Sequence, residues 1–170
     1  AVTKQILAVA NPLGISVEAE LGKIGGTEDN VTVSEREATF TDPDEAARFV
    51  EETGIRSLAV AIGTAHGQYK GVPKLDFDRL TEIKNRVNIP LVLHGSSGVP
   101  DEALREAVKR GVRKINIDTN LREAFTDGVR EVLAEKPNEI DPRKILGPAR
   151  EKMADRVAEK IRIFGSNGKA

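Results

Sequence analysis

Short apolar runs alternate with helix-forming stretches along most of this chain. We expect strands at residues 15–21, 57–62, 90–94 and 112–117. We expect the helices that follow them at residues 42–53, 76–87, 101–110 and 119–135. Apolar strands that alternate with helices of this length are typical of parallel βαβ units, so the pattern predicts an α/β protein.

Two further helices are expected at the ends of the chain. Residues 2–10 form an amphipathic stretch that Pro12 and Gly14 terminate, and residues 142–164 form a long charged one. A (β/α)8 barrel has eight βα units in about 250 residues, whereas this chain of 170 residues has four. We therefore predict half a barrel, with residues 1–170 as part of one barrel domain, because no linker or internal repeat supports two domains.

The composition excludes several classes of function. The 26 Lys and Arg residues nearly balance 27 Asp and Glu, which argues against bulk attraction to nucleic acid or an anionic membrane. The chain has no cysteine, so a metal would need His, Asp or Glu ligands. Neither a long apolar run nor a signal-peptide pattern is found, so we expect a cytoplasmic protein.

The chain has two histidines, and each follows an apolar strand and precedes a glycine. A single histidine of this kind is more often a core or surface residue. His66 and His94 together indicate a metal site, because both fall at the ends of strands where barrel enzymes place their chemistry. A catalytic zinc usually has three protein ligands, so the third comes from Glu20, from another chain or from sequence that is absent.

Other polar residues near the strand ends suggest a substrate site. Glu18 and Glu20 share one face of the first strand, although a solvated edge strand would show the same pattern. Asn116 and Asp118 share one face of the last strand. The segment 95–98, the Asp118–Thr119 helix start and Lys70 could bind phosphate, although alone they are ordinary turn and capping signals.

Five motifs in this order resemble those of the class II, zinc-dependent fructose-bisphosphate aldolases and the related tagatose-bisphosphate enzymes. They are residues 17–22 with 25–29 (VEAELG, GGTED), 66–71 (HGQYKG), 93–98 (LHGSSG), 116–119 (NIDT) and 141–144 with 147–151 (DPRK, GPARE). The resemblance covers essentially the whole chain. It implies reversible aldol cleavage of fructose 1,6-bisphosphate to dihydroxyacetone phosphate and glyceraldehyde 3-phosphate in glycolysis and gluconeogenesis.

The resemblance also implies roles for individual residues. His66 and His94 correspond to zinc ligands, and Glu20 to the carboxylate of a second metal position. Glu28, on a mobile glycine-bearing loop, corresponds to the group that moves the substrate proton, and Asn116 to a residue that contacts the enediolate. The residues that correspond to phosphate and substrate ligands are Gly67, Lys70, Gly95, Ser97, Asp118, Thr119, Arg122 and Arg143, the last reaching from a neighbouring subunit.

The family pattern also implies a homodimer or homotetramer, a sugar bisphosphate substrate and room for a monovalent cation beside the zinc. The first four strands of that pattern, with the first zinc-binding histidine and a catalytic aspartate, are not found here. We therefore expect this chain to be incomplete as an enzyme on its own. Tagatose 1,6-bisphosphate as substrate, or an inactive half-barrel that binds phosphate or a partner, are the alternatives.

Overall fold

The structure is a computed structural model that describes residues 2–28, 31–34, 38–67, 69 and 71–169, with the backbone alone at residues 27, 28, 31 and 33. The chain divides into two compact units, Ala1–Asn116 and Ile117–Ala170, and each is described by itself. Among the helices that the structure describes, none combines the length and apolar character needed to span a membrane.

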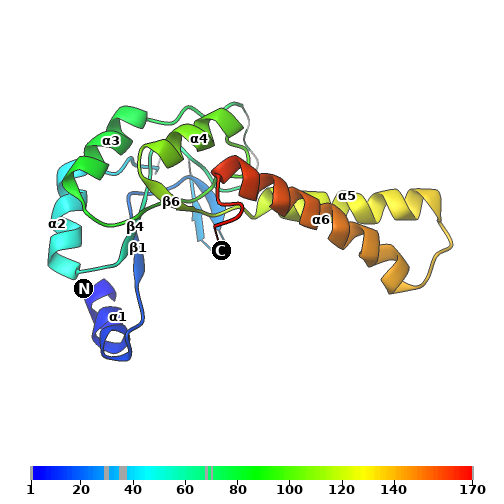
Figure 1. Cartoon of the computed structure of the whole chain (residues 1–170), viewed down its shortest axis with the longest axis horizontal. Helices are drawn as coiled ribbons and strands as arrows, with labels where there is room; N and C mark the ends of the chain where they lie inside the picture. Colours follow the sequence, from blue (N-terminus) through cyan, green and yellow to red (C-terminus); the bar gives the residue numbers. More distant parts are fainter. Residues whose placement is uncertain (1, 29–30, 35–37, 68, 70, 170) are drawn as a thin grey trace. The chain divides into compact units, whose positions relative to one another are not determined.

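The first unit is built on a four-stranded parallel sheet. Its strands are β1 (Glu18–Leu21), β4 (Ser57–Val60), β5 (Leu91–Leu93) and β6 (Val112–Ile115), in the order β1-β4-β5-β6 (Figure 1). Each of these strands pairs with the next parallel strand along the chain, as strands do around a barrel. The structure thus confirms the α/β fold with four parallel strands.

Helix α1 (Val2–Ala10) and the short 3-10 turn η1 (Asn11–Leu13) precede the sheet in the sequence. Helices α2 (Pro43–Thr53), α3 (Phe77–Arg86) and α4 (Asp101–Lys109) follow the parallel strands β1, β4 and β5 in turn. Their buried side chains include Ala46, Leu80, Ile83, Leu104 and Ala107. The fully buried strand residues include Leu58, Val60, Leu91, Leu93 and Val112. These apolar side chains form the core that holds the helices on the sheet.

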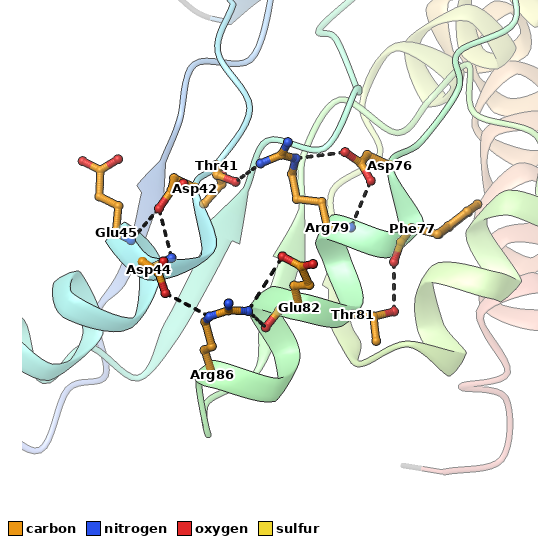
Figure 2. A network of polar contacts seen from close by, with 10 residues as sticks. All are labelled: Thr41, Asp42, Asp44, Glu45, Asp76, Phe77, Arg79, Thr81, Glu82 and Arg86. Carbon is orange, nitrogen blue, oxygen red and sulfur yellow. Dashed lines mark hydrogen bonds and ion pairs between the residues drawn. The ribbon is translucent and has the colours of Figure 1, made fainter.

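Polar contacts join α2 to α3 (Figure 2). The Asp42 carboxylate caps α2 by accepting hydrogen bonds from the amides of Asp44 and Glu45, at 3.0 and 2.9 Å. Arg79 in α3 donates to the Asp76 carboxylate and to the Thr41 carbonyl, both at 3.0 Å. These contacts fix the start of α2 against the start of α3.

Thr41 has a second role, because its buried hydroxyl connects two strand ends. The hydroxyl donates to the Leu21 carbonyl at 2.5 Å and accepts from the Ala61 amide at 2.8 Å. Asp42, and not Thr41, is the N-cap of α2. Thr41 instead holds the carboxyl ends of β1 and β4 together.

A bulge in β6 sets which side chains face the interior of the sheet. Leu91 pairs with Val112, but the next residue, Val92, pairs with Lys114, so Arg113 is an extra residue. A bulge of this kind reverses the alternation of side chains beyond it. Lys114 therefore lies on the same face of the sheet as Val92, opposite to the face that carries Val112.

The segment between β1 and α2 differs from the predicted loop. Gly26–Glu28 (β2) and Val31–Val33 (β3) form a short antiparallel pair. Threonine and valine favour strands, and this local preference overcomes the turn-forming glycines that precede it. The predicted mobile loop thus contains a two-stranded hairpin.

The second unit consists of two long helices, α5 (Thr119–Glu135) and α6 (Pro142–Phe164), which run in opposite directions (Figure 1). Gly128 lies where the helices approach closely, since a Cβ atom there would be 2.6 Å from the Ala149 Cα atom. Asp141 caps α6 by accepting a hydrogen bond from the Arg143 amide at 3.0 Å. The unit is an antiparallel helical hairpin.

Candidate active site

His94 directly follows β5 and lies between two carboxylates of β1. Its Nδ1 atom is 2.8 Å from Glu20 Oε2, and its Nε2 atom is 3.3 Å from Glu18 Oε1. Alternation along β1 places Glu18 and Glu20 on one face, as the sequence predicts. Both carboxylates contact His94, whose side chain is only 13% exposed, although β1 is an edge strand of the sheet and Glu20 is exposed.

Glu18 also binds Lys114 of β6. The Lys114 ammonium lies 2.8 and 2.9 Å from the two Glu18 carboxylate oxygens, and the Ser57 hydroxyl donates to the same carboxylate at 3.3 Å. Burial alone would raise the pKa of Glu18, but hydrogen bonds and charge from Lys114 and His94 outweigh it, so this pKa is lowered. Glu18 is therefore an anion that accepts hydrogen bonds.

His66 lies beyond the end of β4, beside His94. The centroids of the two imidazole rings are 6.2 Å apart, with an angle of 61° between the ring planes. The His66 amide donates to the Gly25 carbonyl at 2.7 Å. Gly26 has to be glycine, because its φ is +105° and a Cβ atom would lie 2.2 Å from the His66 carbonyl oxygen. The segment after β1 thus fixes the backbone of His66.

Tyr69 joins the His66 segment to the segment that follows His94. The tyrosine hydroxyl accepts from the Ala65 amide at 2.6 Å and donates to the Gly95 carbonyl at 2.7 Å. Burial raises the pKa of Tyr69, and the hydrogen bond from Ala65 offsets part of that rise. Gly95 has φ +61°, and a Cβ atom there would lie 2.5 Å from the Ala65 carbonyl oxygen.

The donor set suits a zinc ion but is incomplete. Imidazole nitrogen and carboxylate oxygen are ordinary zinc ligands, and His94 Nδ1 and Glu20 Oε2 lie 2.8 Å apart. Within the part of the chain that the structure describes, no three His, Asp or Glu side chains are arranged to hold a metal ion. His66, His94 and Glu20 thus have the donor types of a zinc site, and a complete shell needs a further ligand from elsewhere.

The other predicted site residues of the first unit are Lys70, Glu28, Gly67, Ser97 and Asn116. Lys70 lies outside the described residues, and Glu28 is described as backbone alone, at the end of β2. Gly67 has φ +85° with open space where a side chain would be. Ser97 is half-buried, and the Asn116 amide, just beyond β6, donates to the Leu93 carbonyl at 3.0 Å. The roles of these residues stay predictions.

Four predicted residues belong to the second unit. Asp118 and Thr119 begin α5, and the Asp118 carboxylate binds the Arg122 guanidinium at 2.9 Å. Arg143 binds the Asp141 carboxylate at 2.8 Å, and its side chain is 89% exposed. Both arginines are solvent-accessible cations, which is the chemistry that a phosphate needs.

Sequence reasoning gave no role to Tyr69 and Lys114, and left Glu18 with two interpretations. Lys114 could have been found, because it precedes Asn116 by two residues and therefore shares its face of the strand. The hydroxyl contacts of Tyr69 depend on loops that are distant in sequence, and no local signal indicates them.

A parallel α/β sheet with paired imidazoles and carboxylates at one end places this chain in the class of barrel-type α/β proteins. Residues 1–169 match the family described as class-II fructose-bisphosphate aldolase. The chain belongs to that family.

Individual relatives and a solved structure also carry the names of aldolases. The chain is 49% identical over 168 residues to sulfofructosephosphate aldolase of Alkalicoccus urumqiensis and 48% identical over 169 residues to a fructose-bisphosphate aldolase of Geobacillus stearothermophilus. Each alignment covers 99% of this chain and 58% of the relative. The crystal structure of the YdjI aldolase from Escherichia coli matches with a TM-score of 0.82 and 40% identity, over 99% of this chain and 56% of that one. The chain thus spans somewhat more than half the length of these relatives.

Proposed function

We propose that this chain carries part of the active site of a zinc-dependent aldolase that reversibly cleaves fructose 1,6-bisphosphate to dihydroxyacetone phosphate and glyceraldehyde 3-phosphate. The main support is the grouping of His66, His94 and Glu20 at one end of the parallel sheet, with Glu20 Oε2 2.8 Å from His94 Nδ1. The family membership supplies the reaction class. A third protein ligand would come from outside the described residues.

In this proposal His66 and His94 hold the zinc, and Glu20 provides an alternative ligand. When bound, the ion acts as a Lewis acid that polarises the substrate carbonyl. Glu28 moves the proton on the carbon beside that carbonyl, and Asn116 contacts the enediolate oxygen. These assignments rest on the motifs that the chain shares with the family.

Phosphate binding is proposed for two groups of residues. Gly67, Gly95 and Ser97 belong to backbone turns whose N–H groups can face an anion, and Lys70 adds a positive charge. In the second unit, Asp118 and Thr119 begin a helix, and Arg122 and Arg143 are cations for the far phosphate. The resemblance leaves room for a monovalent cation among these groups.

A second substrate is favoured by one observation. The relative that is 49% identical is named for sulfofructosephosphate, a fructose phosphate that carries a sulfo group. Initial rates with fructose 1,6-bisphosphate, tagatose 1,6-bisphosphate and sulfofructosephosphate would therefore identify the substrate by the ratio of kcat/KM values.

The metal assignment is tested with His66→Ala and His94→Ala in the full-length enzyme, which would supply the remaining zinc ligand. Each change should abolish stoichiometric zinc and aldol cleavage, because removal of one ligand leaves an incomplete shell. Asn138→Ala, at an exposed position, is the matched control and should retain both. Stoichiometric zinc in either histidine variant would overturn the assignment.

The proposed proton transfer is tested with Glu28→Gln. This change should lower kcat much more than it weakens substrate binding, since the residue is assigned to proton movement and not to the phosphates. Exchange of the dihydroxyacetone phosphate proton with solvent reports the step directly. Unchanged exchange would remove Glu28 from this role.

We further infer a cytoplasmic homodimer or homotetramer, in which the chain forms half of one barrel domain. Several apolar side chains of α1, η1 and the next residues are exposed, and burial of such side chains commonly drives association. They are Val2, Ile6, Val9, Leu13 and Ile15. Sedimentation equilibrium tests the assembly, and a monomer at all concentrations would refute it.

A further inference from the structure

The Tyr69 hydroxyl contacts backbone on both sides of the candidate site. It accepts a hydrogen bond from the Ala65 amide at 2.6 Å and donates one to the Gly95 carbonyl at 2.7 Å. A hydroxyl has one proton to donate and lone pairs that accept, so it makes both contacts at once. Ala65 and Gly95 lie beyond the ends of β4 and β5, where no strand pairing joins them. The hydroxyl therefore links two loop segments.

The ring of Tyr69 lies against Gly98, in the same turn as Gly95. A Cβ atom at Gly98 would lie 2.4 Å from the Tyr69 Cδ2 atom, and its three nearest neighbours would all be atoms of that ring. Gly98 does not have the positive φ that would itself demand glycine, so the ring alone takes the space of a side chain. Because the hydroxyl is held at both of its contacts, the ring cannot turn away without breaking them.

Tyr69 thus lies between two groups of residues that are proposed to bind one phosphate. Gly67 and Lys70 flank it in the sequence, and Gly95 and Ser97 belong to the turn that its hydroxyl and ring contact. An anion that is bound by N–H groups from two separate turns needs those turns at a fixed spacing. Tyr69 is the side chain that connects them.

We propose that Tyr69 is a positioning residue that keeps its own segment and the turn 95–98 at the spacing that the phosphate of dihydroxyacetone phosphate needs. This inference rests on the proposed function, which assigns both segments to phosphate binding. The hydroxyl is occupied by backbone groups on both sides, so Tyr69 acts through the two segments and not by contact with the substrate.

The test uses Tyr69→Phe, Gly98→Ala, Tyr69→Ala and the double variant Tyr69→Ala/Gly98→Ala in the full-length enzyme. Tyr69→Phe removes the hydroxyl and keeps the ring, whereas Gly98→Ala displaces the ring and keeps the hydroxyl. Gly147→Ala is the matched control, because a Cβ atom there would meet nothing within 4 Å. Calorimetry measures the dissociation constants of dihydroxyacetone phosphate and glyceraldehyde 3-phosphate, and competition with a chromophoric chelator measures that of zinc.

Tyr69→Phe should weaken the binding of dihydroxyacetone phosphate about 3–10-fold, because the hydrogen bonds between the segments are lost. Gly98→Ala should weaken it in the parent protein but add no further loss to Tyr69→Ala, since the ring that the methyl group would strike is then absent. The KM for fructose 1,6-bisphosphate should rise by the same factor, with kcat little changed. Binding of glyceraldehyde 3-phosphate and of zinc should stay at the parent values, as should all quantities in Gly147→Ala.

Unchanged affinity for dihydroxyacetone phosphate in both Tyr69→Phe and Gly98→Ala would overturn the proposal. An equal loss for both triose phosphates and zinc would also overturn it, because that result would show general damage to the fold. If Tyr69→Ala does not fold, as judged by circular dichroism, Tyr69→Phe and Gly98→Ala decide the question by the same affinities.

The proposed function can fail separately from this inference. A parent protein that binds dihydroxyacetone phosphate but does not cleave fructose 1,6-bisphosphate would refute the proposed function, and the affinities of the variants would still test the role of Tyr69. A parent protein that binds no dihydroxyacetone phosphate would overturn both.

Discussion

Lys114 and Glu18 form an ion pair between opposite edges of the four-stranded sheet. Lys114 belongs to β6, Glu18 belongs to β1, and two strands separate them in the sheet. With about 4.8 Å between neighbouring strands, the edges are roughly 14 Å apart along the sheet. Between the two edges, β4 presents Ser57 and Ala59 and β5 presents Val92 on the face that carries both side chains.

Ala59→Leu should therefore displace the side chains of Glu18 and His94 and weaken the site. Ala59 is fully buried and follows Ser57 by two residues, so it shares the face that carries Glu18 and His94. A leucine would occupy the space that those side chains use and should destabilise the protein by about 1–3 kcal/mol. Chemical denaturation measures the loss, and a chelator competition should show weaker zinc binding.

The control for this change is Ala154→Leu, an exposed position in α6. It adds the same atoms without filling a buried space, so stability should remain within about 0.5 kcal/mol of the parent. If the two variants had the same free energy of unfolding, the site would have room beside Ala59 for the added atoms, and the prediction would be wrong.

Tyr69 should titrate above its ordinary range. Its folded pKa is raised from 10.0, mainly by burial. A raised pKa means that the folded protein holds the phenolic proton more tightly, so this contribution to stability is complete below about pH 10 and is lost as pH rises through the folded pKa. Because the chain has one tyrosine, the tyrosinate absorbance reports this group alone.

Tyr69→Phe gives the companion measurement. It has no tyrosinate signal, and it removes the hydroxyl between the Ala65 amide and the Gly95 carbonyl, which should cost about 1–3 kcal/mol. Hydrogen exchange at the Ala65 amide should accelerate. Titration of Tyr69 at its ordinary pKa, or an unchanged exchange rate in the variant, would show that the hydroxyl does not join these segments.

Helix positions could be predicted well from the sequence because their signals are local. Asp42 with Pro43 marks the start of α2, and Gly54, with φ +72°, ends it. The bounds of α5 and α6 agree with the predicted 119–135 and 142–164. The strands are shorter than predicted: β4 ends at Val60 and β6 at Ile115. A strand ends where its pairing with a neighbouring strand ends, and the apolar run in the sequence does not show that point.

The candidate site could be predicted only in part. The spacing of Glu18 and Glu20 places both on one face, and the structure confirms that both meet His94. Alternation places Lys114 on the face of Asn116, but no pattern in the segment 112–115 indicates the bulge at Arg113 that pairs Lys114 with Val92. Long-range pairing thus supplied what periodicity could not.

Acid should weaken the capped helix α2. The pKa of Asp42 is lowered, first by the hydrogen bond from the Glu45 amide and then by that of Asp44, from an ordinary value of 3.8. A lowered folded pKa means that the contribution to stability is complete above that ordinary value and is lost as pH falls through the folded pKa. Asp42→Asn keeps a capping oxygen that does not titrate.

Acid unfolding followed by circular dichroism compares the two proteins. The stability of Asp42→Asn should change less between neutral and acidic pH than that of the parent, while Asp42→Ala should be less stable than both at neutral pH. Equal acid responses of the parent and Asp42→Asn would show that protonation of this carboxylate does not contribute.

Gly128→Ala tests the close packing of α5 on α6. In an open helix position this change usually stabilises by about 0.5–1 kcal/mol, because glycine loses more conformational freedom on folding. At Gly128 the added Cβ atom would lie 2.6 Å from the Ala149 Cα atom and 3.1 Å from its Cβ atom. Backbone cannot yield as a flexible side chain can, so the overlap should dominate and destabilise the protein by about 1–3 kcal/mol.

Thr126→Ala, at an exposed position of the same helix, is the control and should be neutral or slightly stabilising. Urea denaturation of the three proteins gives the comparison, and a Gly128→Ala protein more stable than the parent would contradict the close approach of the two helices.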